Sequence, residues 1–281
     1  MKALSKLAAI AAIVLVVGLI VSAIGMALLF STESKNMGTG KNIVLTQQDI
    51  LGTNTIVNDL IINIGKVEMT LKSGDSYSVT ANRIVEKDLK TEYKNGALHI
   101  SYNSKSSFWS WFDDSFSWFN FNHTPEITVT LPVGASYESV EINTGMGAAD
   151  LSDISAGKLT LKVGMGEFKG RNIVSDFCKI EAGMGQVTLD GFIVKSDLFL
   201  ECGMGELNLK GAVTGKSTVK CGMGSVTLDL DGDIEDYDID VSMGMGECRI
   251  NGHSQSGRRN TSAPNKINVS GGMGAIYLNI Y

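Results

Sequence analysis

Proline and histidine are scarce in this chain, with 3 residues of each among 281, and there are only 4 cysteines. The histidines, at positions 99, 123 and 253, are isolated from one another, so the sequence presents no obvious general base. Few prolines, 32 glycines and a repeat over nearly half of the chain favour one elongated body over two ordinary domains.

Basic charge is also in short supply. Apart from Lys2 and Lys6, 22 lysines and arginines stand against 30 aspartates and glutamates, a net charge of −8 beyond residue 30. This balance argues against nucleic acid, and against an anionic lipid surface, as a partner of the body as a whole.

One long uncharged apolar run extends from Leu7 to Phe30. As a helix it would span about 36 Å, against a hydrocarbon core of about 30 Å. We predict a cytoplasmic tail at residues 1–6, a transmembrane helix at 7–30 and a linker at 31–41, with the remainder in the cell envelope outside the cytoplasm. A cleavable signal peptide is the alternative, although this run exceeds the usual apolar length of about 7 to 15 residues.

The tripeptide Gly-Met-Gly occurs seven times, at intervals of 19, 19, 20, 19, 22 and 28 residues. Its central residues are Met146, Met165, Met184, Met204, Met223, Met245 and Met273. A period near twenty predicts a solenoid, in which each repeat forms one coil and buries its apolar side against its neighbours.

Apolar and polar residues alternate on both sides of each Gly-Met-Gly, which is the period of a β-strand. One aliphatic column, from Ile142 to Val269, stands three residues before the motif, and another column, from Ala149 to Ile276, stands two residues after it. The inward positions just before and just after the motif are five residues apart, an odd number, so simple alternation cannot continue through the motif and the chain must bend there. The pattern predicts an all-β fold, a parallel β-solenoid (β-helix) of about nineteen-residue coils over residues 42–281, after the transmembrane helix.

The glycines suit such a corner because they accept positive φ and allow neighbouring backbones to approach closely, and we expect short polar loops to close each turn. Each motif methionine continues the inward parity of the upstream strand, so we expect seven thioethers along one internal edge, with exposed methionines as the alternative. A soft ion such as Cu(I) could collect on a methionine ladder, but core packing explains the pattern better. We therefore assign neither a metal nor a cofactor.

The repeat is irregular at both ends. Residues 60–71 (LIINIGKVEMTL) resemble a further coil, and Lys94-Asn95-Gly96 predicts a hairpin turn before Ala97–Tyr102. We expect the polar residues from Asn251 to Lys266 to form a surface loop. The last coil should end at Tyr281 with an uncapped strand edge, on which another molecule could stack.

The run ITVTLPVGASYESVEINTGMG, from Ile127 to Gly147, and the strand, Gly-x-Gly, strand units that follow it resemble the putative-adhesin β-strand-repeat proteins, also called toastrack domains. The resemblance covers residues 42–281. The arrangement of a membrane anchor followed by this domain is similar to that of family members from bacteria. The resemblance implies an extracytoplasmic role in interaction or envelope-stress sensing, and it implies no reaction.

Eight of the 20 aromatic residues lie in a short segment within an insertion at residues 103–124. They are Phe108, Trp109, Trp111, Phe112, Phe116, Trp118, Phe119 and Phe121. Aromatic residues of this kind favour membrane interfaces and protein hot spots, so this segment is a candidate interaction surface. A lid over the N-terminal end of the solenoid is the alternative.

Other motifs carry less chemistry. The acidic run from Asp229 to Asp240 lacks the spacing of an EF-hand. Cys202 and Cys221 occupy equivalent positions in successive repeats, where a disulfide is possible but thiols packed in the core are favoured.

We predict a non-catalytic module that acts by contact with an envelope or cell-surface partner, as an adhesin-like element, scaffold or sensor. The alternatives are a homo-oligomer stacked end to end and a glycan-processing enzyme, although no carboxylate cluster supports the enzyme.

Overall fold

The structure, a computed structural model, describes residues 40–53, 56–103, 124–259 and 262–281, which fold into one unit from Lys41 to Tyr281. The predicted transmembrane helix at residues 7–30 lies outside the described residues. The helices within the described ranges lack the length and apolar character needed to cross a bilayer.

The described residues form strands almost throughout. The first elements are β1 (Lys41–Leu45), α2 (Gln47–Leu51), β2 (Asp59–Ile64), β3 (Glu68–Gly74), β4 (Ser78–Ile84), the 3-10 turn η1 (Glu86–Asp88), β5 (Leu89–Lys94), β6 (Ala97–Tyr102), β7 (Glu126–Pro132) and β8 (Ser136–Thr144). Then follow β9 (Ala148–Val163), β10 (Glu167–Ala182), β11 (Gln186–Cys202), β12 (Glu206–Val213), β13 (Lys216–Cys221) and β14 (Ser225–Leu230). The last are η2 (Ile234–Asp236), β15 (Tyr237–Met243), β16 (Glu247–Ile250), β17 (His253–Ser254), β18 (Gly257–Arg259), β19 (Asn265–Gly271) and β20 (Ala275–Ile280).

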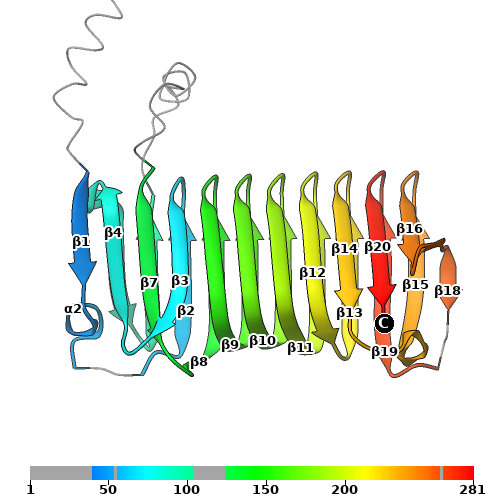
Figure 1. The fold of residues 1–281 in the computed structure, drawn as a ribbon, viewed down its shortest axis with the longest axis horizontal. Coiled ribbons are helices and arrows are strands. Elements are labelled where there is room, and N and C mark those ends of the chain that lie inside the picture. The colour runs from blue at the N-terminus through cyan, green and yellow to red at the C-terminus, as the bar shows by residue number, and fades with distance from the viewer. Residues whose placement is uncertain (1–39, 54–55, 104–123, 260–261) are drawn as a thin grey trace, which may run out of the picture. The chain divides into compact units, whose positions relative to one another are not determined.

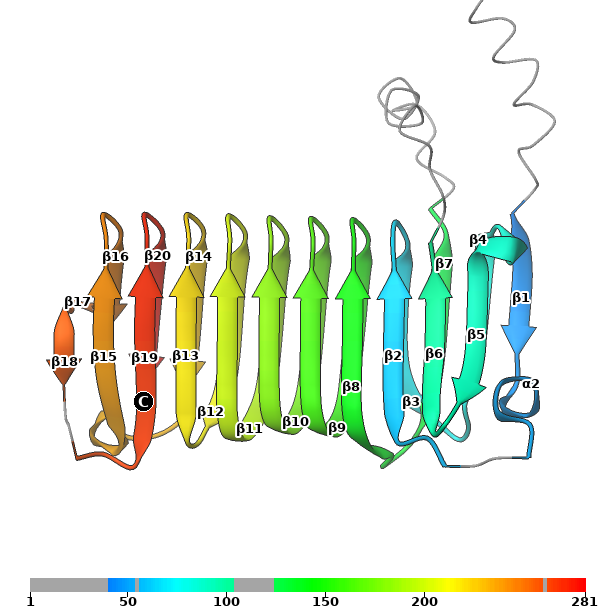
Figure 2. The ribbon, with the colours of Figure 1, turned by 180° about the vertical axis from the view of Figure 1, so that it is seen from behind.

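The strands lie in two rows that face each other (Figures 1 and 2). The first row runs β1, β4, β7, β3, β9, β10, β11, β12, β14, β20, β16 and β17. The second row runs β5, β6, β2, β8, β9, β10, β11, β13, β19, β15 and β18. Pairing is parallel from β3 to β16 and from β6 to β15, so the predicted parallel solenoid is confirmed there, whereas the outermost pairs are antiparallel.

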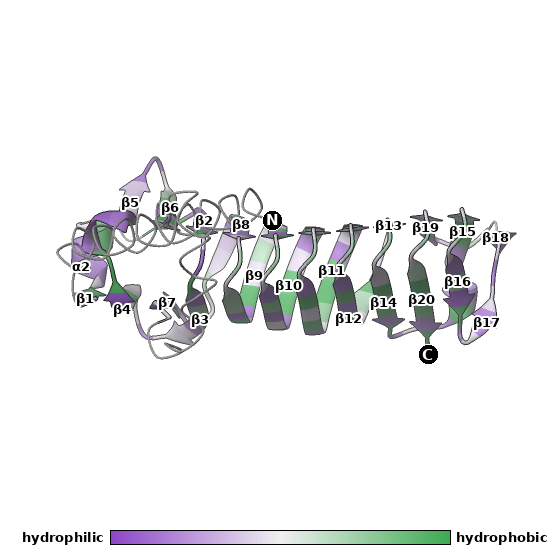
Figure 3. Ribbon diagram, turned by 90° about the horizontal axis from the view of Figure 1, so that it is seen from above, coloured by the Kyte–Doolittle hydropathy of each residue, from purple (hydrophilic) through white to green (hydrophobic). Residues whose placement is uncertain are grey.

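The core lies between the two rows and consists of the predicted columns. Ile142, Leu161 and Ile180 before the corners are fully buried, as are Phe168 and Val187 after them. Buried and outward residues alternate along β9 and β10 except at their internal bends, and hydrophobic and hydrophilic positions alternate in the same way (Figure 3). Each coil therefore packs its apolar residues against the equivalent apolar residues of the next coil. This stacking stabilises a repeat that has no core of its own.

Each Gly-Met-Gly forms the bend between a strand of the second row and a strand of the first. The backbone ladder continues through the bend, since Met165 N donates to Gly145 O at 2.8 Å and Met184 N donates to Gly164 O at 2.8 Å. The motif glycines do not have positive φ, so that part of the prediction was wrong. Close approach of neighbouring backbones explains them instead: a Cβ built on Gly166 would lie 2.0 Å from Gly147 O.

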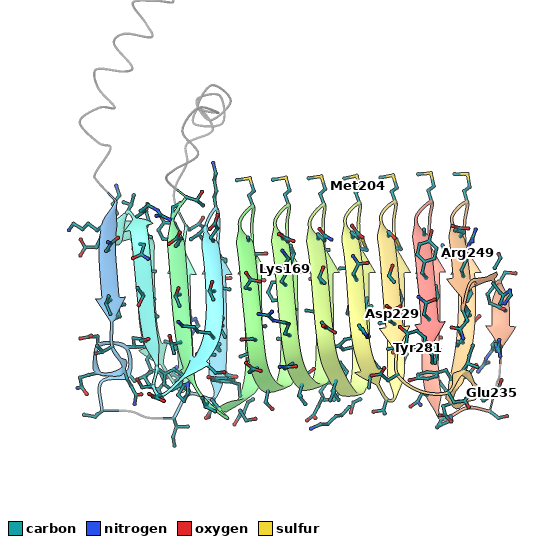
Figure 4. All side chains as sticks on the ribbon, in the orientation of Figure 1. Lys169, Met204, Asp229, Glu235, Arg249 and Tyr281 are labelled. Carbon is teal, nitrogen blue, oxygen red and sulfur yellow. The ribbon has the colours of Figure 1, made fainter. Side chains whose placement is uncertain are left out.

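The motif methionines do not line an internal edge, so the predicted ladder of buried thioethers was wrong. Their side chains point away from the body along one edge of the coils (Figure 4), and six of the seven are 53–56% exposed. Strand parity stops where the bend begins: the residue before the first glycine, such as Val163 or Ala182, fills the inside of the corner. The central residue then lies on the convex side of the turn, where its side chain meets solvent.

The opposite edge also differs from expectation. Short polar loops were predicted between coils, but β9, β10 and β11 run continuously around this bend. Positive φ occurs there at Asp153, Asn172 and Gly191, which are equivalent positions in three successive coils. The Asn172 amide donates to the Asp153 carboxylate at 3.0 Å, so a short polar ladder replaces the loops.

The C-terminal coil is not at the end of the stack, so the predicted open edge at Tyr281 was wrong. Strand β19 pairs with β13 on one side and β15 on the other, and β20 lies between β14 and β16 in the same way. The coil formed by β15 and β16 is outermost instead, and β18 and β17 cover its two strands. The segment predicted as a loop from Asn251 to Lys266 therefore contains this pair of capping strands, which we call the C-terminal cap.

The N-terminal predictions agree with the structure. Residues 60–71 form a coil, with β2 and β3 joined at a Gly65-Lys66-Val67 corner. Asn95 and Gly96 have φ of 52° and 82°, which fits a type I′ turn between the antiparallel strands β5 and β6. This end is closed by β1, α2 and β5 rather than by a regular coil.

Candidate functional site

The sequence singled out two groups of residues, and the structure describes one of them. The aromatic segment from Phe108 to Phe121 lies outside the described residues. The seven motif methionines form a single row, which we call the methionine ridge. In space the row begins beside Lys66, the central residue of the first corner, and runs Met146, Met165, Met184, Met204, Met223, Met273 and Met245.

Exposure along the ridge shows that the methionines cover one another. Those with a neighbour on each side are 53–56% exposed, whereas Met245, on the outermost coil, is 84% exposed. A shallow groove of about 1050 Å³ runs beside the ridge, and Glu167, Gln186 and Glu206 contribute to its wall. The ridge is thus a strip of thioethers with acidic and amide groups beside it.

A second candidate surface lies on the outer side of the second row of strands. It comprises Lys158 from β9, Phe177 and Lys179 from β10, Phe199 from β11, and Lys216 and Lys220 from β13, and we call it the lysine–phenylalanine patch. Strand register brings these residues together, because Lys179 stands opposite Phe199, and Lys158 stands opposite Phe177.

The two phenylalanines differ in their surroundings, since the Phe177 side chain is open to solvent and the Phe199 ring lies beneath two lysine ammonium groups. Phe177 is 50% exposed. The ammonium groups of Lys179 and Lys220 lie 5.4 and 5.3 Å from the centroid of the Phe199 ring, within the range of cation–π attraction. A shallow hollow of about 280 Å³ lies between these side chains and Lys216.

One lysine of the patch is paired with a carboxylate, which offsets part of the positive charge of the patch. A hydrogen bond to Glu181, with N···O of 2.7 Å, raises the pKa of Lys179 above its ordinary value. Sequence reasoning missed this patch because outward columns were read as mixtures of lysine, glutamate and threonine. The signal was present in the alignment of the repeats, where Phe177 and Lys158 are separated by one period and Lys179 and Phe199 by another.

The cysteines do not form a nucleophilic site. All four are buried free thiols, and burial raises the pKa of Cys202 and Cys248 to about 11 and that of Cys178 to about 12. Cys202 and Cys221 are register partners in β11 and β13, as predicted, yet both remain unbonded thiols. A raised pKa disfavours the thiolate, which is the reactive form.

The acidic run is divided between structural roles. Asp233 accepts a hydrogen bond from Glu235 N at the start of η2. Asp238 is covered by the C-terminal cap, where the Arg258 guanidinium donates to both carboxylate oxygens, from Nε to Oδ1 at 2.9 Å and from Nη2 to Oδ2. These hydrogen bonds lower the pKa of Asp238 below its ordinary value. Across the described ranges, no group of three or more histidine, cysteine or acidic residues is arranged to hold a metal ion.

Comparison with known proteins places these features in a family. The model of the Toastrack DUF4097 family matches residues 57–266. No curated protein matches the chain.

Several solved bacterial structures resemble the chain. A putative cell adhesion protein of Clostridium sporogenes is 18% identical, over 86% of this chain and 100% of that one, with a TM-score of 0.35. A putative adhesin of Bacteroides fragilis is 14% identical, over 85% and 97%, with a TM-score of 0.42. A putative lipid binding protein of Parabacteroides distasonis is 16% identical, over 87% and 97%, with a TM-score of 0.44.

Proposed function

The chain belongs to the Toastrack DUF4097 family, and we propose that it is a non-catalytic, adhesin-like contact module of the bacterial cell envelope. In this proposal the apolar segment at residues 7–30 anchors it in the membrane, and the solenoid projects outside the cytoplasm. Membrane fractionation tests the anchor: the full chain should pellet with membranes, and release by high salt alone would contradict it.

The lysine–phenylalanine patch carries the proposal. Monomeric proteins expose single apolar residues freely, but here two neighbouring aromatic rings, bordered by lysines and by Asp197, lie together on an acidic protein. The hollow between them is shallow and lies on a flat sheet face, which suits an extended ligand better than an enclosed metabolite.

Charge decides the class of that ligand. Five lysines, Lys158, Lys162, Lys179, Lys216 and Lys220, project from the same face, on the three strands β9, β10 and β13. Two of them are paired with carboxylates, Lys162 with Glu141 at 3.5 Å and Lys179 with Glu181 at 2.7 Å. Lysine ammonium groups attract carboxylate and phosphate groups, and the exposed ring of Phe177 offers an apolar surface for a flat ring between them. We therefore take the ligand to be an anionic surface polysaccharide.

The test compares two faces of the same solenoid. The variant Lys158→Glu with Lys216→Glu reverses two charges in the patch. The control Lys169→Glu with Lys210→Glu makes the same change of charge on the first row of strands. Binding of the full chain to an acidic polysaccharide, such as alginate, is measured at low salt with dextran as the neutral reference.

The patch variant should bind alginate at least tenfold more weakly than the control variant, and neither variant should bind dextran. Higher ionic strength should weaken binding of the unmodified chain, because exposed charges are screened within about 10 Å at 0.1 M salt. Equal affinities of the two variants would refute the proposal, since binding would then follow net charge rather than the patch.

A further inference from the structure

The methionine ridge needs an explanation that the fold does not supply. Core packing cannot account for it, because each motif methionine points into solvent (Figure 4). The corner itself tolerates another residue: Lys66 occupies the same position in the first coil, between Gly65 and Val67. The corner requires the two glycines of the motif, because an added Cβ there would clash with the backbone of the neighbouring coil.

Neighbouring thioethers of the ridge are held in register by the backbone. Met204 N donates to Gly183 O and Met223 N donates to Gly203 O, both at 2.8 Å. Adjacent coils of a parallel sheet are about 4.8 Å apart. Each methionine has three rotatable bonds beyond this fixed backbone, so two neighbouring sulfur atoms can adjust their separation by small rotations.

That spacing matches a soft ion with two sulfur ligands. A metal–sulfur bond of about 2.3 Å, as found for zinc thiolates, places two sulfur atoms about 4.6 Å apart on opposite sides of a linearly coordinated ion. Thioethers are soft ligands that suit Cu(I), whereas calcium and magnesium prefer oxygen ligands. Glu206 in the wall of the adjoining groove adds negative charge that attracts a cation, whereas the charge of Glu167 is offset by Lys169 at 2.8 Å.

We propose that the methionine ridge binds soft monovalent cations of the Cu(I) and Ag(I) class, each ion bridging the sulfur atoms of two methionines on adjacent coils. The ridge contains six adjacent pairs, from Met146 with Met165 to Met273 with Met245. Because a thioether carries no proton, binding does not require deprotonation, in contrast to binding by thiols. The site is independent of the lysine–phenylalanine patch on the second row of strands.

Two variants with the same number of methionines test adjacency. The alternating variant Met165→Leu, Met204→Leu, Met273→Leu keeps four motif methionines and leaves no two of them on adjacent coils. The block variant Met146→Leu, Met165→Leu, Met184→Leu also keeps four and leaves three adjacent pairs. Leucine has a similar volume, and all of these positions are exposed, so both variants should keep the fold.

Ag(I) serves as a probe that needs no reductant, and calorimetric titration of the full chain in chloride-free buffer gives affinity and stoichiometry. The block variant should bind with affinity close to that of the unmodified chain and with about half as many ions. The alternating variant should bind at least tenfold more weakly. Equal binding by the two variants would overturn the proposal, because single thioethers or other groups would then be the ligands.

The buried thiols need a separate readout, since silver also binds cysteine. Methyl-13C labelling of methionine reports directly on the thioethers, and Ag(I) should shift the signals of the ridge methionines while leaving that of buried Met69 in place. Affinity should be the same at pH 5.5 and pH 7.5. An affinity that rises steeply with pH, with methionine signals unmoved, would assign the ions to the thiols and refute the ridge site.

Discussion

The second glycine of each motif should tolerate substitution less well than the other two residues of the motif, and Gly205→Ala is the clearest test. A Cβ built on Gly205 lies 2.1 Å from Gly185 O. An ordinary C···O contact is about 3.3–3.6 Å, so the two coils must separate locally by more than about 1 Å. The φ of Gly205 is not positive, so the cost comes from this contact rather than from backbone strain.

Separation of the coils breaks identifiable hydrogen bonds. Glu206 N donates to Gly185 O at 3.0 Å and Gly205 N donates to Gly183 O at 3.1 Å, and a further 1 Å ends both. Two lost bonds cost about 1–3 kcal/mol and overpacking costs about 1–3 kcal/mol more, whereas the stiffer unfolded chain returns about 0.4–1 kcal/mol. The expected destabilisation is about 3 kcal/mol.

Native-state hydrogen exchange measures this cost coil by coil, which suits a repeat array whose unfolding need not be two-state. Two neighbouring substitutions serve as references. Gly203→Ala, whose Cβ would lie 2.8 Å from Gly183 O, should cost less than Gly205→Ala. Met204→Ala, at an exposed side chain, should change stability by no more than about 0.5 kcal/mol. If Gly205→Ala were as mild as Met204→Ala, close backbone approach would not be the reason for the glycines.

Two further predictions concern the C-terminal cap and the thiols. Because hydrogen bonds from Arg258 lower the pKa of Asp238 from its ordinary value of 3.8, their contribution to stability is present above that pH and is lost as the pH falls through the lower folded value. Arg258→Ala should therefore speed hydrogen exchange in β15 at pH 7, and the difference from the unmodified chain should shrink as the pH falls below 3.8; a difference that stays constant on acidification would contradict the ion-pair role. The four buried thiols should resist a disulfide reagent in the native protein at pH 8 and react in full after denaturation, whereas fast reaction of Cys202 or Cys221 before unfolding would contradict their burial.

The regular part of the fold was predictable from the sequence because burial repeats at fixed positions. The columns that contain Leu161 and Phe168 identified both strands of each coil, and the fixed spacing identified the corner between them. The direction of the methionines was not predictable in this way, since alternation describes an extended chain and ceases to apply at the first residue of a bend.

Two other features depend on information that a single repeat does not contain. Coils with similar apolar columns can stack in more than one order, so the sequence did not reveal that β19 lies between β13 and β15. The lysine–phenylalanine patch joins residues from four coils, each of which alone resembles an ordinary solvated strand. The irregular intervals of 22 and 28 residues did mark the region where the stacking order departs from the chain order.

The capped ends of the solenoid determine how such a protein can change its length in evolution. A coil added after β20 would meet strands that are already paired on both sides, and at the outermost coil β17 and β18 occupy the edge. Growth must therefore proceed by duplication of an internal unit, such as the nineteen residues between Met146 and Met165. Each such duplication would lengthen the solenoid by about 4.8 Å and add one thioether to the ridge. The length of the solenoid and the number of ridge methionines would therefore increase together.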